Sequence, residues 1–316
     1  MIAARAKMVP RRDFDDFSRI LPHERWLAAQ FGLDCGDGDN LPAAVAAMQF
    51  HGIDADGGDW FIVQPVHLHI ARDHLVLTDP RQLNLDADEA RALFAVAQPL
   101  FADAGMDLRY GDAAMWFVRR DDWQDMQTAT PDAATGHNID IWMPRGAQAR
   151  AWRKVQNEVQ MEWHLHGANA AREARGAKPV NSLWLWGRAT APARLPPPRH
   201  AAAFNLGGWT EALAHRCARH ARDQGVQDAI EAPGDTLVVC EDLVEAAFAQ
   251  DWSEWLARMQ ALEAAWLAPL RDALKAGKIK HLRVILTHTT GLMEFPVDRL
   301  SLHKFWSQPS LARLAP

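Results

Sequence analysis

The sequence predicts an α/β protein with a mainly parallel sheet that has helices on both faces, together with a smaller α+β subdomain. Apolar strand patterns alternate with long helical patterns after residue 147, as in βαβ units. The segment 183–186 is apolar on both faces, which is typical of a strand covered from both sides. We therefore expect an N-terminal helical segment over 1–54, an α+β subdomain over 55–146 and an α/β core over 147–316.

Composition limits the classes of function. The chain has 316 residues, of which 48% are hydrophobic, enough for a sizeable core, and its net charge of −6 argues against nucleic acid as a partner. No run of about 18 apolar residues suggests a membrane span, and the start of the chain lacks a signal-peptide pattern. With three widely spaced cysteines, a cytoplasmic location is expected. The 14 tryptophans indicate a core of large rings, or alternatively an aromatic platform.

The N-terminal segment and the α+β subdomain are expected from local patterns. Helices are predicted first over 22–31 and 42–50, and the alternation of His67 and His69 with apolar residues then predicts a hairpin over 59–80. A capped helix over 86–104 and a second hairpin over 107–120 follow.

The core is expected from longer patterns. Apolar residues at spacings of three and four predict a helix over 147–166, followed by a short helix over 168–175. Helices are also predicted over 210–225 and 252–275, the second with an apolar inner face. Strands are predicted over 183–186, 235–240 and 281–288.

Histidines and glutamates on the helix ending near 166 raise the question of a metal. Glu158 and Glu162 lie one turn apart, and His166 follows on the same side, while His164 lies round the helix. The alternative is a hydrogen-bonded polar face. His67 and His69 pose the same choice, between a metal pair and solvated side chains.

Arginines after this helix suggest an anion pocket. Arg172 and Arg175 are three residues apart and can converge on a phosphate or carboxylate. Asn169 precedes them, Asn181 and Ser182 can anchor the loop, and Arg188 follows the next strand. The alternative is an ion-pair network with Glu173 or Glu158 that fixes the helix to the sheet. His288, with Thr289 and Thr290 at a strand end, is a further candidate for metal or phosphate binding.

The stretch HLHGANAAREARGAKPVNSLWLWGRATAPARLPPP resembles a signature of archaeal-type cofactor-independent phosphoglycerate mutases. It is more similar still to a proteobacterial offshoot described as a regulator of pathogenicity factors of the E type. The resemblance covers about 55–190, and it implies an alkaline-phosphatase-like core in which a Ser or Thr nucleophile lies beside two metal ions. The matching residues are His166, Asn169, Arg172, Gly176, Pro179, Asn181 and Gly187.

Departures from the family pattern point away from catalysis. No Asp-Gly follows an N-terminal strand, DTLVVCEDLVEAAF lacks the expected histidine, and Thr287 replaces a metal-binding Asp in LTHTTG. We therefore expect a catalytically degenerate, regulatory relative that binds a phosphorylated or carboxylated small molecule. The alternatives are an active phosphoglycerate mutase or phosphatase, with Mn or Zn held partly by His166 and His288, and a protein-interaction module.

Overall fold

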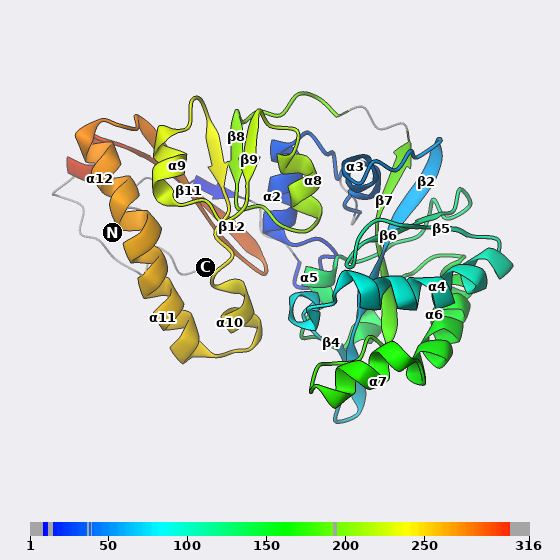
Figure 1. Ribbon diagram of the computed structural model, residues 1–316. Coiled ribbons are helices and arrows are strands. Elements are labelled where there is room, and N and C mark those ends of the chain that lie inside the picture. Colours follow the sequence, from blue (N-terminus) through cyan, green and yellow to red (C-terminus); the bar gives the residue numbers. More distant parts are fainter. Residues whose placement is uncertain (1–8, 12–14, 37, 39, 192–194, 304–316) are drawn as a thin grey trace. The chain divides into compact units, whose positions relative to one another are not determined.

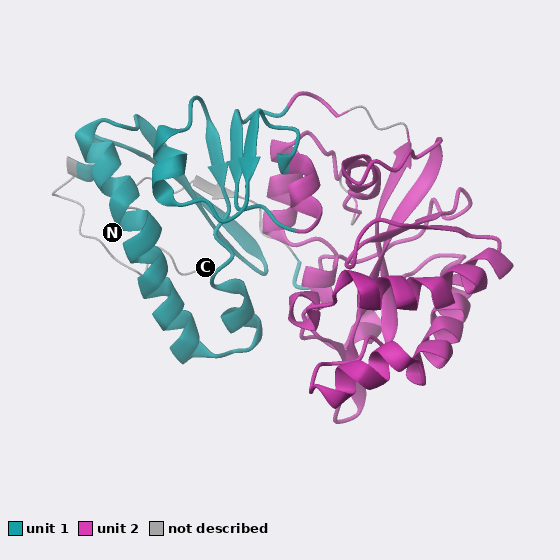
Figure 2. Cartoon of the chain, viewed as in Figure 1, with its two compact units in different colours: residues 1–17, 198–207, 214–316 teal, residues 18–197, 208–213 magenta. Residues whose placement is uncertain are grey.

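The computed structural model describes residues 9–11, 15–36, 38, 40–191 and 195–303 (Figure 1). The chain forms two compact units (Figure 2). Unit 1 comprises Met1–Phe17, Pro198–Gly207 and Ala214–Pro316, and unit 2 comprises Ser18–Pro197 and Gly208–Leu213. These units do not follow the boundaries expected at 54/55 and 146/147, because the segment 147–197 packs with the preceding part of the chain.

A four-stranded antiparallel sheet forms the centre of unit 2. Its order is β5 (Asp107–Tyr110), β6 (Trp116–Arg119), β2 (Gly58–Val66) and β7 (Ser182–Ala191). β7 pairs antiparallel with β2, with Leu185 opposite Val63. The strand predicted at 183–186 therefore exists and is buried, but the parallel sheet expected around it was wrong.

Helices cover both faces of this sheet. α4 (Ala87–Asp103) and α6 (Ala149–His164) pack on one face, and α3 (Ala44–Phe50) packs on the other against β2 and β7. This two-sided cover explains why β7 is apolar on both faces. The predicted cap of α4 is confirmed, since the Asp86 carboxylate accepts hydrogen bonds from the backbone N–H groups of Asp88 and Glu89.

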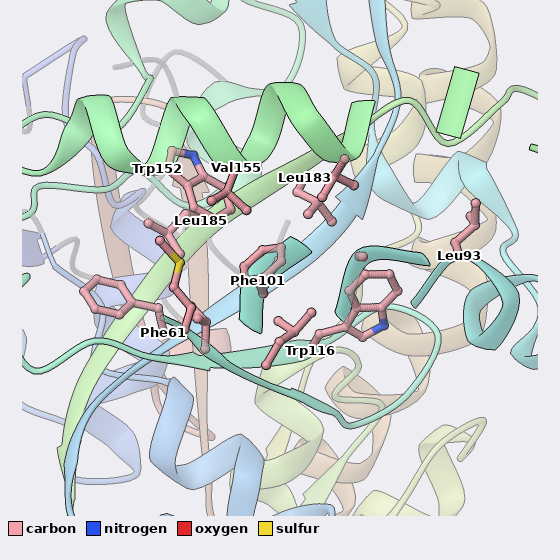
Figure 3. Close-up of a cluster of buried hydrophobic side chains, with 14 of the residues drawn as sticks. Phe61, Leu93, Phe101, Trp116, Trp152, Val155, Leu183 and Leu185 are labelled. Carbon is pink, nitrogen blue, oxygen red and sulfur yellow. The ribbon is translucent and has the colours of Figure 1, made fainter. Parts of the chain in front are cut away.

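The core between α4, α6 and the sheet is built from large rings and branched side chains (Figure 3). The apolar stripe predicted on α6 is confirmed, with Trp152, Val155, Val159 and Trp163 buried. The indole N–H of Trp163 donates to the carbonyl of Leu93 at 3.0 Å, which joins α6 to α4. Six tryptophans of unit 2 are fully buried, namely Trp60, Trp116, Trp123, Trp152, Trp163 and Trp184. For these six the prediction of a tryptophan core is confirmed.

Shorter elements complete unit 2. The predicted hairpin consists of β3 (Leu68–Ala71) and β4 (His74–Leu77), which form a two-stranded sheet. The remaining elements are α2 (Pro22–Gln30), the 3-10 turns η1 (Pro80–Leu83) and η2 (Ile139–Ile141), α5 (Pro131–Ala134), α7 (Gly167–Ala174) and most of α8 (Trp209–Ala214).

Unit 1 contains two three-stranded sheets. β8 (Ala202–Phe204) lies between β10 (Thr236–Val238) and β9 (Arg219–Ala221) in a parallel sheet. β12 (Gly291–Asp298) lies between β1 (Val9–Arg11) and β11 (His281–His288) in an antiparallel sheet. Among the described residues, the strands of the parallel sheet are three residues long, and the sheets are mainly antiparallel.

The helices of unit 1 are α9 (Val226–Glu231), α10 (Val244–Phe248), α11 (Trp252–Leu262) and α12 (Ala268–Ala276), with the π-helical segment η3 (Glu263–Leu267) and the 3-10 turn η4 (Ser301–His303). α11, η3 and α12 run on from one another, as predicted over 252–275, but no residue of α11 is buried. The helix predicted over 210–225 exists only at its start, because α8 ends at Ala214 and β9 follows. Within the described residues, none of the helices has the length and apolarity required to cross a membrane.

Candidate functional site

Arg172, the central residue of the expected anion pocket, is completely buried in α7. Its Nε donates to the carbonyl of Lys178 at 2.8 Å, and its Nη2 donates to the carbonyl of Leu83. Its Nη1 pairs with Glu89 Oε2 at 2.5 Å. All three nitrogens of the guanidinium are thus engaged inside the protein.

Arg172 and Arg175 do converge on an anion, and that anion is the carboxylate of Glu89 on α4. Arg175 Nη2 lies 2.5 Å from Glu89 Oε1, while the same carboxylate caps the start of α4 through the N–H of Asp86. The structure therefore shows an ion-pair network of the kind weighed as the alternative. Its partner is Glu89, rather than the expected Glu173 or Glu158.

The two asparagines act as backbone clamps. Asn169 Nδ2 donates to the carbonyls of Trp163 and Val180, and its Oδ1 accepts from the N–H of Val180, each at 2.8 Å. Asn181 binds Leu68 in the same two-way manner, through the N–H and the carbonyl of that residue. Each amide therefore replaces a backbone partner and fixes the segment before β7.

Arg188 lies apart from the other predicted anion ligands. It is seven residues beyond Asn181 along β7, roughly 23 Å at the rise of an extended strand. Its Nη1 lies 3.4 Å from Asp59 Oδ1, a carboxylate that also accepts from Thr190 Oγ1 at 2.5 Å. The five residues do not meet in one place.

The predicted metal histidines have structural partners. His166 is the N-cap of α7, where its Nδ1 accepts from the N–H of Ala168 at 3.2 Å. His288 is the last residue of β11, and its Nδ1 accepts from the N–H of Thr290 at 3.3 Å. His166 belongs to unit 2 and His288 to unit 1.

The remaining metal candidates lie in unit 2 and do not form a common group of ligands among the described residues. Glu162 and His164 are exposed, and Glu158 lies 3.9 Å from Lys154. His67 and His69 stack with ring centroids 6.3 Å apart, and their Nδ1 atoms contact the carbonyl of Pro179 and the hydroxyl of Thr78. Burial is the main cause that lowers the pKa of His67.

A different group brings metal-type ligands together in unit 2. His23, Glu24 and Asp132 each present a nitrogen or oxygen, and these atoms lie within 4.8 Å of one another. It is the one group of three such side chains found in the described part of the chain. His23 and Glu24 lie in the first turn of α2, and Asp132 lies in the first turn of α5.

Surrounding groups hold these side chains in place. Glu24 Oε2 accepts from the hydroxyl of Thr130 at 2.7 Å and from the N–H of Leu21 at 2.8 Å. Asp132 receives both Nη atoms of Arg81, at 2.9 and 3.2 Å, and lies 3.7 Å from His23 Nε2. Arg81 Nε in turn donates to Asp79, 2.8 Å away. Two helix starts are therefore joined by a connected polar network.

The two carboxyl groups have opposite pKa shifts. Burial raises the pKa of Glu24 to about 7, against the lowering effect of His23. Burial also acts to raise the pKa of Asp132, but the His23 hydrogen bond and the Arg81 charge prevail and lower it to about 2. Groups with separated pKa values in one network are typical of functional sites, although ion-pair networks also show them.

Sequence reasoning missed this group, although a signal exists. Both helices begin with the same chemistry: a proline in the first turn followed by an acidic residue, in LPHE and in TPD. Each pattern alone predicts an ordinary helix start. Their juxtaposition depends on a contact between residues more than a hundred positions apart.

Comparison with known proteins relates part of the chain to one group of enzymes. It is similar to the 2,3-bisphosphoglycerate-independent phosphoglycerate mutase of Methanosarcina mazei, with 31% identity over 68 residues, which is 22% of this chain and 17% of the relative. A probable mutase of the same kind from Geobacter sulfurreducens is 27% identical over 136 residues, which is 42% of this chain and 33% of the relative. The matches thus span well under two thirds of the relatives' length. No family model matches the chain.

Two solved structures cover most of the chain with low similarity. The PH0037 protein of Pyrococcus horikoshii has a TM-score of 0.46 and 12% identity. This match covers 94% of this chain and 78% of the PH0037 chain. The cofactor-independent phosphoglycerate mutase of Thermoplasma acidophilum has a TM-score of 0.39 and 14% identity. This match covers 94% of this chain and 80% of the mutase chain. The sequence matches support relatedness to the cofactor-independent phosphoglycerate mutases.

Proposed function

We propose that this chain is a catalytically degenerate relative of the cofactor-independent phosphoglycerate mutases, of the proteobacterial regulatory type, which acts in the cytoplasm by binding rather than by turnover. The observation that carries the proposal is the internal use of the signature side chains. Asn169 and Arg172 direct their hydrogen-bonding atoms at backbone groups and at Glu89.

Burial supports a structural role for Arg172. An arginine that recognises a phosphate must present its planar fork to the ligand. The Arg172 side chain has no exposed surface, and its donors join α7 to α4 and to the turn after α7. A signature shared with mutases is therefore explained as a way of holding this part of the fold together.

A small anion remains the proposed ligand, with the exposed edge of the same network as its site. The Arg175 side chain is 49% exposed, and one of its nitrogens contacts Glu89. Lys178 follows three residues later and is exposed, with its Nζ 3.2 Å from Gln82 Oε1. These two cations suit a phosphorylated or carboxylated small molecule.

Equilibrium binding tests this proposal. We expect 3-phosphoglycerate or inorganic phosphate to raise the melting temperature of the full chain, since a ligand specific for the folded state stabilises it. Arg175→Ala should abolish the shift, whereas Arg153→Ala, which removes an exposed arginine from α6, should leave it unchanged. Equal shifts in both variants, or no shift in the wild type, would reject the anion site.

A further inference from the structure

The side chains of His23, Glu24 and Asp132 have the composition of a metal site that the mutase signature does not contain. One imidazole nitrogen and two carboxylates lie within 4.8 Å of one another, and they come from α2 and α5. We propose that these three residues bind a single divalent transition-metal cation. This inference goes beyond the proposed function and is independent of it.

The donor types of the group suit a cation. Glu24 and Asp132 each provide a carboxyl group, and His23 provides an imidazole nitrogen. Both kinds of group are common ligands of divalent transition metals.

The ligands are held in position before any cation arrives. Thr130 and the N–H of Leu21 fix Glu24, and Arg81 fixes Asp132 while itself bound to Asp79. Hydrogen bonds of this kind orient ligand side chains in metal sites and raise affinity. A carboxylate offers about four acceptor positions on its two oxygens, so these hydrogen bonds leave others for the metal.

Exposure makes the group accessible to an ion from solvent. The side chains of His23 and Asp132 are 35% and 21% exposed, whereas Glu24 is buried beneath them. Two oxygens and one nitrogen suit Zn²⁺ or Mn²⁺, and three protein ligands leave a coordination position for water or an anion.

Metal titration of the full chain, with any purification tag removed and after chelation, tests the site. We expect Zn²⁺ or Mn²⁺ to bind with one equivalent and to raise the melting temperature. His23→Gln should weaken binding at least tenfold, and the matched control His69→Gln should not. One-equivalent binding that is equally tight in both variants would overturn the proposal, as would a dissociation constant above about 1 mM for both ions.

Cobalt provides a readout that does not require a variant to fold. Bound to the wild-type chain, Co²⁺ should show visible bands that differ from those of the aqueous ion, because an imidazole nitrogen replaces water in its coordination shell. Excess Zn²⁺ should remove these bands. A spectrum identical to that of aqueous Co²⁺ at one equivalent would contradict the site, whatever the stability of the variants.

Discussion

Removing Arg172 should destabilise unit 2 far more than removing Arg175, although both arginines bind the same carboxylate. Arg172→Ala breaks a buried ion pair and leaves the carbonyls of Leu83 and Lys178 without their donor. Breaking a buried pair costs about 3–5 kcal/mol. Because Glu89 keeps Arg175 as a partner, the loss of the ion pair should cost about 3 kcal/mol, near the lower limit. The two lost hydrogen bonds to the carbonyls add about 1 kcal/mol each, so we expect about 5 kcal/mol in total.

Arg175→Ala is the matched control for this prediction. The Arg175 side chain is half-exposed, so its pair with Glu89 contributes about 1 kcal/mol or less. Urea unfolding followed by tryptophan fluorescence measures both losses, and most tryptophans lie in unit 2. Glu89→Ala combined with Arg172→Ala should cost less than the sum of the two single changes, since the pair is coupled. Losses equal within 0.5 kcal/mol for the two arginine variants would refute the reasoning.

Three further changes probe the elements around this network. Asn169→Ala should cost about 2–4 kcal/mol in urea unfolding, because it leaves the N–H and the carbonyl of the buried Val180 unpaired; a loss below 1 kcal/mol would show that the clamp is dispensable. The pKa of His67 is lowered mainly by burial, so the unfolded chain binds more protons as the pH falls below about 6.5. Stability should therefore be complete above that pH and decline below it, and His67→Gln should reduce the decline measured between pH 7.5 and 5; an unchanged pH profile would contradict this. Gly187→Ala should cost more than Gly176→Ala by thermal unfolding. Both have a φ of +76°, where alanine costs about 1–2 kcal/mol, but only at Gly187 does the new Cβ approach a side chain, Ile62, at 3.1 Å; equal costs would refute the crowding.

Local signals in the sequence were enough for several elements of unit 2. The capping residue Asp86 and the periodic stripe on α6 placed two helices correctly, because caps and periodicity are encoded within a few neighbouring residues. The apolar character of 183–186 likewise identified a buried strand. These features depend on residues that are adjacent in the chain, so they can be recognised from the sequence alone.

Pairing between distant segments could not be read in the same way. An apolar strand covered on both faces is compatible with parallel and with antiparallel neighbours, and the partner of β7 lies more than a hundred residues earlier in β2. β12 was missed altogether, since Pro296 within it argues against a strand, although it pairs along its whole length with β11.

The same limit applies to the candidate sites. The spacing of Arg172 and Arg175 predicted convergence on an anion, and the structure confirms the convergence. The anion belongs to Glu89, 83 residues earlier, and no local pattern indicates this partner. The His23, Glu24 and Asp132 group escaped prediction for the same reason, because its halves are two ordinary helix starts.

Turnover of phosphoglycerate tests the central claim most directly. The measurement follows 3-phosphoglycerate by phosphorus NMR with micromolar purified chain, in the presence of Mn²⁺, Zn²⁺ or Co²⁺ in turn. We predict no formation of 2-phosphoglycerate and no release of phosphate with any of the ions. Conversion of 3-phosphoglycerate that appears with one of the ions and disappears when the ion is chelated would contradict the account.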